Sequence, residues 1–183
     1  MSDATPLQPL QPAPNKSCGD CGLCCKLLGI EAISKEPGKW CAHFRRGSGC
    51  GIYSDRPTAC AGFHCLWLTS DRLDDMWRPN KAGFVMFPEQ DGRRLNVVVD
   101  ESKPLAWKTE PYYSRLKAMS QRALDGYELL ISIGWRRIIV FPDQEVDLGV
   151  INPEHKIISG YSTKDGQRVP FAMVLSDLPP DDA

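Results

Sequence analysis

The sequence predicts an α+β protein in which an irregular cysteine-rich module precedes a small antiparallel sheet with one main helix. Three observations predict this class. All eight cysteines lie between Cys18 and Cys65. The remainder contains short apolar segments separated by turn residues, as antiparallel strands do. Only the segment at residues 110–124 has apolar side chains recurring at helical spacing.

Composition is that of an ordinary globular protein and excludes some classes. The 183 residues are 42% hydrophobic and 25% charged, with a formal net charge of -1. A chain with this balance is not a bulk polycation for nucleic acid. No apolar run is long enough to span a bilayer, and residues 1–6 lack the features of a signal peptide. We therefore expect a cytoplasmic protein that binds neither nucleic acid nor a membrane.

Three parts follow one another along the chain. Residues 1–14 contain four prolines and predict a flexible, extended arm. Residues 15–68 form the glycine-rich cysteine module. Residues 69–183 contain no cysteine and predict the α+β part. We expect this part to pack on the cysteine module as one globular unit.

The elements of the α+β part follow from periodicity and turn residues. Apolar segments at 83–87 and 95–99 predict a hairpin around the turn at 90–92. The helix at 110–124 has Thr109 as its expected cap and Pro111 in its first turn. Later segments predict two strands at 129–133 and 135–141, a last hairpin at 157–161 and 169–175, and a loose tail at 179–182.

The clustering of the cysteines favours metal binding over disulfides. A disulfide framework usually staples a whole small secreted chain, whereas here one third of a longer chain holds every cysteine. Residues 15–67 carry seven basic and four acidic side chains, a formal sum of +3. This surplus would offset the net charge of -2 of a divalent ion with four thiolates.

The first cysteine segment is C-x2-C-x2-C-C, from Cys18 to Cys25. Two intervening residues let one turn present both sulfurs to the same ion. The adjacent Cys24 and Cys25 project in different directions, so we expect one of them to serve a second centre. The segment also matches the start of a bacterial iron–sulfur pattern, but the continuation of that pattern is absent.

The second segment contains Cys41, Cys50, Cys60 and Cys65 between aromatic residues. Pro57 predicts the start of a short helix on which Cys60 and His64, four residues apart, share a face. We expect Phe44, Tyr53 and Phe63 to shield a metal site from water.

Together, the two segments resemble a bacterial family of zinc- or iron-chelating cysteine-cluster proteins. The resemblance covers about residues 17–66, includes the pair Arg56-Pro57, and does not extend beyond Asp71. It implies that the metal ligands are Cys18, Cys21, Cys24, Cys25, Cys41, Cys50, Cys60 and Cys65. It implies no particular reaction.

The residues leave the metal open. Eight thiolates can close two tetrahedral zinc sites, or four can hold a 4Fe-4S cluster. Copper(I) also suits thiolates. His43 and His64 are alternative ligands, but we expect them to hydrogen-bond a sulfur or a carbonyl. His155 is expected at the surface, and no pair of histidines has the spacing of an open iron site with two histidines and a carboxylate.

The resulting hypothesis is a cytosolic protein that chelates zinc or iron and has a structural or metal-handling role. The alternatives are an iron–sulfur protein with a redox or enzymatic role, or an adaptor that recruits a protein partner through a sheet edge. The sequence has no nucleophile elbow, P-loop or dinucleotide fingerprint, so no catalytic residue is predicted. The five tryptophans are expected in the core or as a shield, and the three Arg-Arg pairs on solvated faces.

Overall fold

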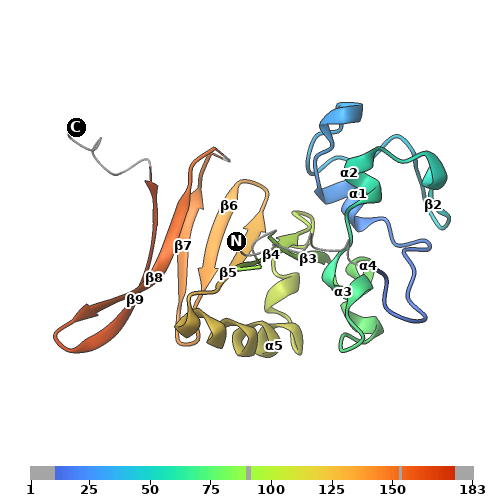
Figure 1. Cartoon of the computed structure of the whole chain (residues 1–183). Coiled ribbons are helices and arrows are strands. Elements are labelled where there is room, and N and C mark those ends of the chain that lie inside the picture. Colours follow the sequence, from blue (N-terminus) through green and yellow to red (C-terminus); the bar gives the residue numbers. More distant parts are fainter. Residues whose placement is uncertain (1–10, 90–91, 153, 176–183) are drawn as a thin grey trace, which may run out of the picture. The chain divides into compact units, whose positions relative to one another are not determined.

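The computed structural model describes residues 11–89, 92–152 and 154–175. The chain divides into two compact units, Met1–Lys81 and Ala82–Ala183, which Figure 1 shows in sequence colours. Most of the expected arm (1–14), part of the expected turn (90–92) and the expected loose tail (179–182) lie outside the described residues. No helix within the described residues combines the length and the apolar character needed to cross a bilayer.

The first unit is built from short elements. Its helices are α1 (Leu23–Leu27), α2 (Thr58–Ala61), α3 (Leu66–Thr69) and α4 (Pro79–Ala82), which ends at the boundary. Single 3₁₀ turns lie at Glu31–Ile33, Tyr53–Asp55 and Asp75–Trp77. Strands β1 (Phe44–Arg45) and β2 (Gly49–Cys50) form an antiparallel ribbon. Such short elements bury few side chains each, which limits the core that the unit can form.

A small group of apolar side chains forms the core of this unit. Leu23 and Leu27 are buried on one side of α1, and Trp67 and Leu68 are buried in α3. The ammonium group of Lys16 donates hydrogen bonds to the carbonyls of Trp67 (3.0 Å), Ser70 (2.6 Å) and Leu73. The backbone N–H of Ala13 bonds the carbonyl of Leu68 at 2.8 Å. Ordered packing in this unit therefore includes Ala13.

A five-stranded sheet forms the centre of the second unit. Its strands are β3 (Phe84–Pro88), β4 (Arg94–Val99), β5 (Glu128–Ile133), β6 (Arg136–Val140) and β7 (Glu145–Val150), in that order across the sheet. Adjacent strands are antiparallel except β4 and β5, which are parallel. The expectation of a wholly antiparallel sheet is therefore wrong. A crossover at residues 100–127 separates β4 from β5, and such a connection returns the chain in the same direction.

The main helix is shorter than expected. Helix α5 spans Tyr112–Met119, and residues Ser120–Asp125 continue as a 3₁₀ helix. Thr109 does not cap it, because its hydroxyl donates to the carbonyl of Leu105 (3.4 Å). The carboxylate of Glu110 instead accepts the N–H of Ser114 (3.4 Å) and its hydroxyl (2.8 Å). The capping prediction identified the right turn but the wrong side chain.

One strand of the sheet was not expected. β7 contains Asp147 and Gly149, residue types that are depleted in strands, so its sequence gives little β signal. It forms because β6 offers an antiparallel partner, with an irregular register between Arg137 and Ile138. The ribbon of β8 (Ile157–Lys164) and β9 (Gln167–Val174) confirms the last predicted hairpin.

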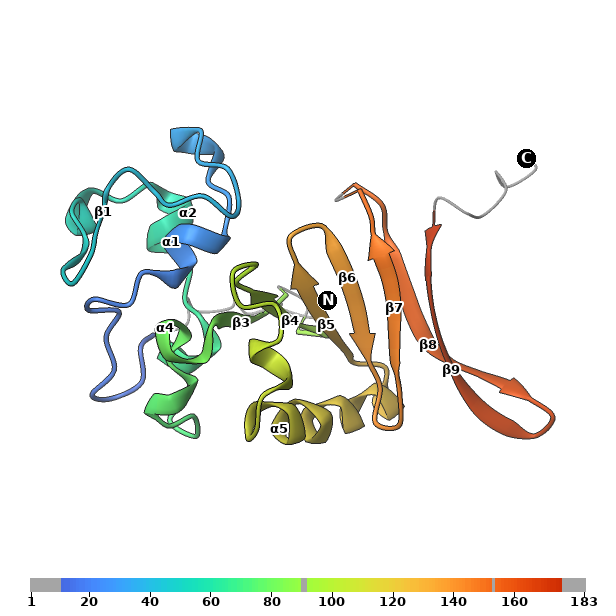
Figure 2. The same ribbon diagram turned by 180° about the vertical axis from the view of Figure 1, so that it is seen from behind.

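The two faces of the sheet are covered by different elements. Side chains alternate between faces along each strand, so Phe84 shares one face with its partner Val99. The ring of Tyr112 in α5 packs edge-on against Phe84, 5.2 Å between centroids, which places the start of α5 on this face. Ile157 and Tyr161 of the ribbon β8–β9 pack against the cluster that includes Leu130 and Ile139 on the opposite face. Figure 2 shows this ribbon beside β7.

Two groups of residues depart from their expected locations. Trp67, Trp77 and Trp107 are buried, whereas Trp40 and Trp135 are about half exposed, so these two are not core residues. The Arg-Arg pairs are likewise divided. Arg45, Arg46, Arg93 and Arg136 are exposed, whereas Arg94 and Arg137 are half-buried. Neighbouring residues of a strand point to opposite faces, so one member of a pair can be drawn inward.

Truncating Leu116 should destabilise the second unit. Its side chain is fully buried in α5, so Leu116→Ala removes apolar contacts and leaves a cavity. We expect the free energy of unfolding to fall by about 3 kcal/mol, measured by urea denaturation. Leu124→Ala is the matched control, because Leu124 is 47% exposed in the following 3₁₀ helix. Equal losses in the two variants would contradict the buried location of Leu116.

Candidate metal centre

The first cysteines lie in a turn and at the start of a helix. The N–H of Cys21 bonds the carbonyl of Cys18 at 2.9 Å, which closes the turn. Helix α1 then begins at Leu23, so Cys24 and Cys25 occupy its first turn. Because Leu23 and Leu27 anchor one side of α1 in the core, the helix holds its cysteines at a fixed place relative to the turn.

Backbone hydrogen bonds bring later cysteines next to α1. The N–H of Cys41 bonds the carbonyl of Cys25 at 3.0 Å. The carbonyl of Cys41 accepts the N–H of Phe44, also at 3.0 Å, and Phe44 is the strand partner of Cys50. Three cysteines from distant parts of the sequence, Cys25, Cys41 and Cys50, are thus linked through the main chain.

The last two cysteines flank short helices. Cys60 lies in α2, and its N–H bonds the carbonyl of Pro57 at 2.9 Å. Cys65 immediately precedes α3, and its carbonyl accepts the N–H of Leu68 at 3.0 Å. Helix α2 begins after Pro57 as expected, but it ends at Ala61. The prediction that Cys60 and His64 share a helix face is therefore wrong.

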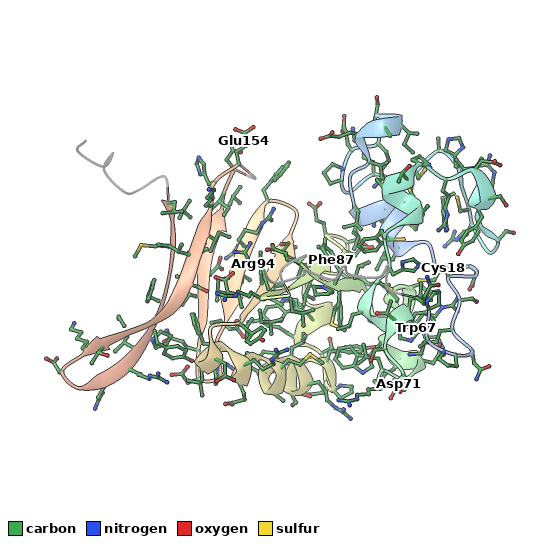
Figure 3. All side chains as sticks on the ribbon, viewed as in Figure 1. Cys18, Trp67, Asp71, Phe87, Arg94 and Glu154 are labelled. Atoms are coloured by element: carbon green, nitrogen blue, oxygen red, sulfur yellow. The ribbon has the colours of Figure 1, made fainter. Side chains whose placement is uncertain are left out.

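All eight cysteines line one cavity of about 180 Å³. Each is partly buried, and none forms a disulfide. The wall also contains apolar side chains from several elements, including Leu28, Ile30, Ile52 and Leu68. Figure 3 labels Cys18 and Trp67 within this unit. In the described part of the chain, no three His, Cys, Asp or Glu side chains lie close enough together to hold a metal ion as they stand.

Charge interactions group the cysteines into two adjoining sets. A thiolate at Cys65 faces those of Cys18 and Cys21, and the same two face Cys24. A thiolate at Cys60 faces Cys25, Cys41 and Cys50. We group Cys18, Cys21, Cys24 and Cys65 as a first set and Cys25, Cys41, Cys50 and Cys60 as a second. Cys25 also interacts with Cys24 and Cys18, so the two sets meet at this residue. Each set has the four soft donors that a tetrahedral ion requires.

The adjacent Cys24 and Cys25 lie where the two sets meet. Hydrogen bonding with Cys24, helped by the charges of Lys35 and Arg56, lowers the pKa of Cys25 to about 7. The same bond and burial raise the pKa of Cys24. Burial raises the pKa of Cys65 to about 11. The raised pKa values of Cys18, Cys24, Cys60 and Cys65 mean that these four thiols release a proton less readily, and a bound cation would favour the release.

Two cations face the sulfurs. Lys35 is only 9% exposed, and its ammonium group donates to the carbonyls of Lys26 (2.7 Å) and Leu28. Burial lowers the pKa of Lys35, while the charges of Cys25, Cys41, Cys24 and Cys60 oppose that shift. Arg56 lines the cavity and lies 3.7 Å from the ring centroid of Tyr53. These cations are placed to offset the charge of thiolates.

Arg78 fixes the position of the first turn. Its guanidinium donates to the carbonyl of Cys18 at 3.0 Å and to the carboxylate of Asp20 at 2.7 Å. The sequence analysis identified neither Arg78 nor Lys35. Arg78 lies 60 positions from Cys18, and no local pattern links residues at that separation. Lys35 lies between the polar residues Ser34 and Glu36, so its sequence context predicts a solvent-exposed side chain.

The histidines and aromatic residues depart in part from expectation. His43 lines the cavity and His64 does not. Among the described residues, neither side chain has a hydrogen-bond partner, so the expected bond to a sulfur or carbonyl is wrong, and Nδ1 of His64 is buried without a partner. Tyr53 and Phe63 line the cavity. Phe44 instead stacks on Trp40, with 4.5 Å between ring centroids.

Comparisons of the chain with protein-family models, curated proteins and solved structures gave no match. The resemblance to cysteine-cluster proteins therefore remains a prediction that rests on the spacing of the cysteines and the residues between them.

Proposed function

We propose that this chain chelates zinc or iron through its eight cysteines and has a structural or metal-handling role. The observation that carries the proposal is that all eight thiols line one cavity, although they come from separate parts of the first unit. The donors are soft, which suits zinc and iron. None of them is used in a disulfide. We place the protein in the cytoplasm, because that compartment keeps thiols reduced.

The donor count supports two closed sites. Each set of four thiolates would give a divalent ion a net charge of -2. Lys35 and Arg56 face the sulfurs and would reduce this charge. Four thiolates fully occupy a tetrahedral ion and leave no open position for a substrate. A structural or metal-handling role fits this donor set better than catalysis by the bound metal.

Metal analysis of protein purified without oxygen tests the proposal. We expect about two zinc or iron ions per chain and, for zinc, no visible colour. Broad absorption near roughly 400 nm with inorganic sulfide would identify an iron–sulfur cluster on the same cysteines. Protein that contains no metal, and whose eight thiols react equally fast with and without added zinc or iron, would overturn the proposal.

Replacing Lys35 should weaken metal binding. Lys35→Met removes the buried ammonium group near the second cysteine set, so the thiolates there lose an offsetting charge. We expect zinc affinity to fall by roughly tenfold, measured by competition with a coloured chelator. The control is Lys39→Met, because Lys39 is exposed and pairs with Glu36 at 2.6 Å. Equal affinities in the two variants would show that Lys35 has no effect on the site.

A further inference from the structure

The sheet of the second unit has one face that changes from apolar to polar. On this face Leu130 of β5 lies beside Ile139 of β6. The next pair of residues on the same face of β5 and β6 is Ser132 and Arg137. Asn96 of β4 is the partner of Leu130 on the other side, so it extends the same face. A sheet face buried by protein alone has no need of these three polar residues.

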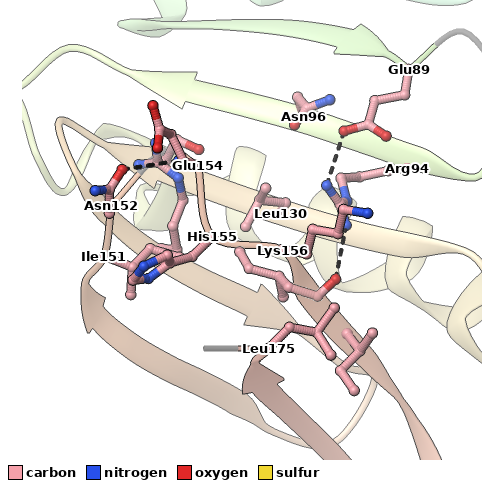
Figure 4. A pocket seen from close by; sticks show the side chains of 14 residues that line it. Glu89, Arg94, Asn96, Leu130, Ile151, Asn152, Glu154, His155, Lys156 and Leu175 are labelled. Carbon is pink, nitrogen blue, oxygen red and sulfur yellow. Dashed lines mark hydrogen bonds and ion pairs between the residues drawn. The ribbon is translucent and has the colours of Figure 1, made fainter. Parts of the chain in front are cut away.

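The ribbon β8–β9 covers the apolar part of this face. Ile157, Tyr161 and Ala172 of the ribbon pack against the cluster that contains Leu130 and Ile139. Beside this packing lies a cavity of about 500 Å³ that Asn96, Ser132 and Arg137 help to line. Figure 4 shows this pocket, whose other side chains include Asn152, Glu154 and His155. The volume lies within the usual range for small-molecule sites.

Two of the polar side chains, those of Asn96 and Ser132, have no partner among the described residues, and their polar atoms keep some accessible surface. Asn96 is 9% exposed and Ser132 is 8% exposed. Within the described residues, neither side chain makes a hydrogen bond. Polar groups in a mostly buried position are normally hydrogen-bonded to protein, water or a ligand. Both residues line the cavity, so a molecule bound there can supply the missing bonds.

The two arginines of the pocket differ in their partners. Arg94 pairs with Glu128 at 2.5 Å and with Glu89 at 3.0 Å. Arg137 donates through one terminal nitrogen to the carbonyls of Gly134 (2.6 Å) and Arg136 (3.1 Å). Considering only described residues, no carboxylate lies within ion-pairing distance of Arg137. The half-buried guanidinium of Arg137 therefore has N–H donors that no described residue uses, and these donors are available to an anion.

Among the described residues, Lys156 is a second cation of the pocket without an ion-pair partner. Lys156 and His155 line it, together with the carboxylates of Glu89 and Glu154. Arg94 already pairs with Glu89. Among the described lining residues, Glu154 is the one carboxylate besides Glu89, and it shares the pocket with Arg137 and Lys156.

We propose that this pocket binds a small organic anion whose carboxylate or phosphate group is held by Arg137, with Ser132 and Asn96 hydrogen-bonding the same molecule. A guanidinium group presents paired donors that match both oxyanions, so the two share one recognition chemistry. The buried amide and hydroxyl add specificity, because a ligand without matching polar groups leaves them unsatisfied. This site is independent of the cysteines, since every residue that lines it belongs to the second unit.

Anion titrations of the full chain test the proposal. Inorganic phosphate and succinate are added separately at constant ionic strength, and the side-chain amide signals of Asn96 are followed by NMR. We expect saturable shifts with a dissociation constant of about 1–10 mM for at least one anion. Saturation by phosphate alone indicates a phosphate-bearing ligand, and by succinate alone a carboxylate. No saturation by either anion up to about 50 mM would overturn the proposal.

Two neighbouring arginines provide a matched pair of variants. Arg137→Gln should weaken anion binding at least about tenfold. Arg136→Gln makes the same change in charge, but Arg136 is exposed and pairs with Asp147. It should bind as the unaltered chain does, and equal weakening in both variants would overturn the proposal.

A third variant keeps the test valid if Arg137→Gln misfolds. Asn96→Leu has a similar volume and removes the unsatisfied amide, so we expect an unchanged or higher melting temperature. The anion affinity, followed here through the backbone amide of Ser132, should still fall. A variant that binds the anion as tightly as the unaltered chain would contradict the role of Asn96.

Discussion

Removal of bound metal is expected to unfold the first unit while the five-stranded sheet stays folded. The first unit has short helices, a two-residue ribbon and a small core, so it buries little apolar surface. Binding of a structural zinc ion contributes about 10 kcal/mol or more, which exceeds the stability of many whole domains. The sheet of the second unit has an extensive apolar core of its own, which includes Val97, Ile131 and Val140.

Hydrogen exchange measured by mass spectrometry separates the two outcomes. After chelation, amides at residues 18–70 should exchange within seconds, and those of β3–β6 should remain protected. Cys21→Ser should have the same effect in part, because it removes one ligand from the first set. Restoring zinc should restore protection to the unaltered chain. A metal-free first unit that stays protected would mean that metal does not supply its stability.

Local patterns predicted much of the fold and of the candidate site. Short apolar segments predicted strands at 95–99 and 129–133, and β4 and β5 cover these residues. Spacing identified the Cys18–Cys21 turn. The strands and the turn could be predicted because each depends on residues that are close together in the sequence.

Contacts between distant residues were beyond prediction. The parallel pairing of β4 with β5 depends on where the crossover places the chain. Lys35 lies near the cysteines because the segment after α1 folds back, with the N–H of Ile30 bonded to the carbonyl of Lys35. Arg137 reads as a solvated residue until the cavity beside the β8–β9 ribbon is known. A sequence pattern indicates which face of a strand or helix a residue lies on, but it does not indicate which other segment covers that face.

Gly49→Ala is expected to disrupt the cysteine site by forcing two backbone segments apart. Gly49 has a φ of +84°, which strains any residue with a Cβ. An added Cβ would also lie 2.2 Å from the carbonyl oxygen of Gly19, in the turn between Cys18 and Cys21. The two segments would have to separate by roughly 1 Å or more. Since Cys50 follows Gly49 directly, its sulfur would move away from the turn.

Gly47→Ala provides the matched control for this steric effect. Gly47 lies in the same ribbon with a φ of +79°, but an added Cβ there meets no atom within 4 Å. Backbone strain alone should cost Gly47→Ala about 1 kcal/mol. Strain and clash together should cost Gly49→Ala about 4 kcal/mol or more in the unfolding of the zinc-loaded protein, and lower its zinc content. If both variants lose the same small amount, the close approach of β2 to the first turn does not contribute to the site. A large loss confined to Gly49→Ala would show that this contact holds Cys50 beside the turn.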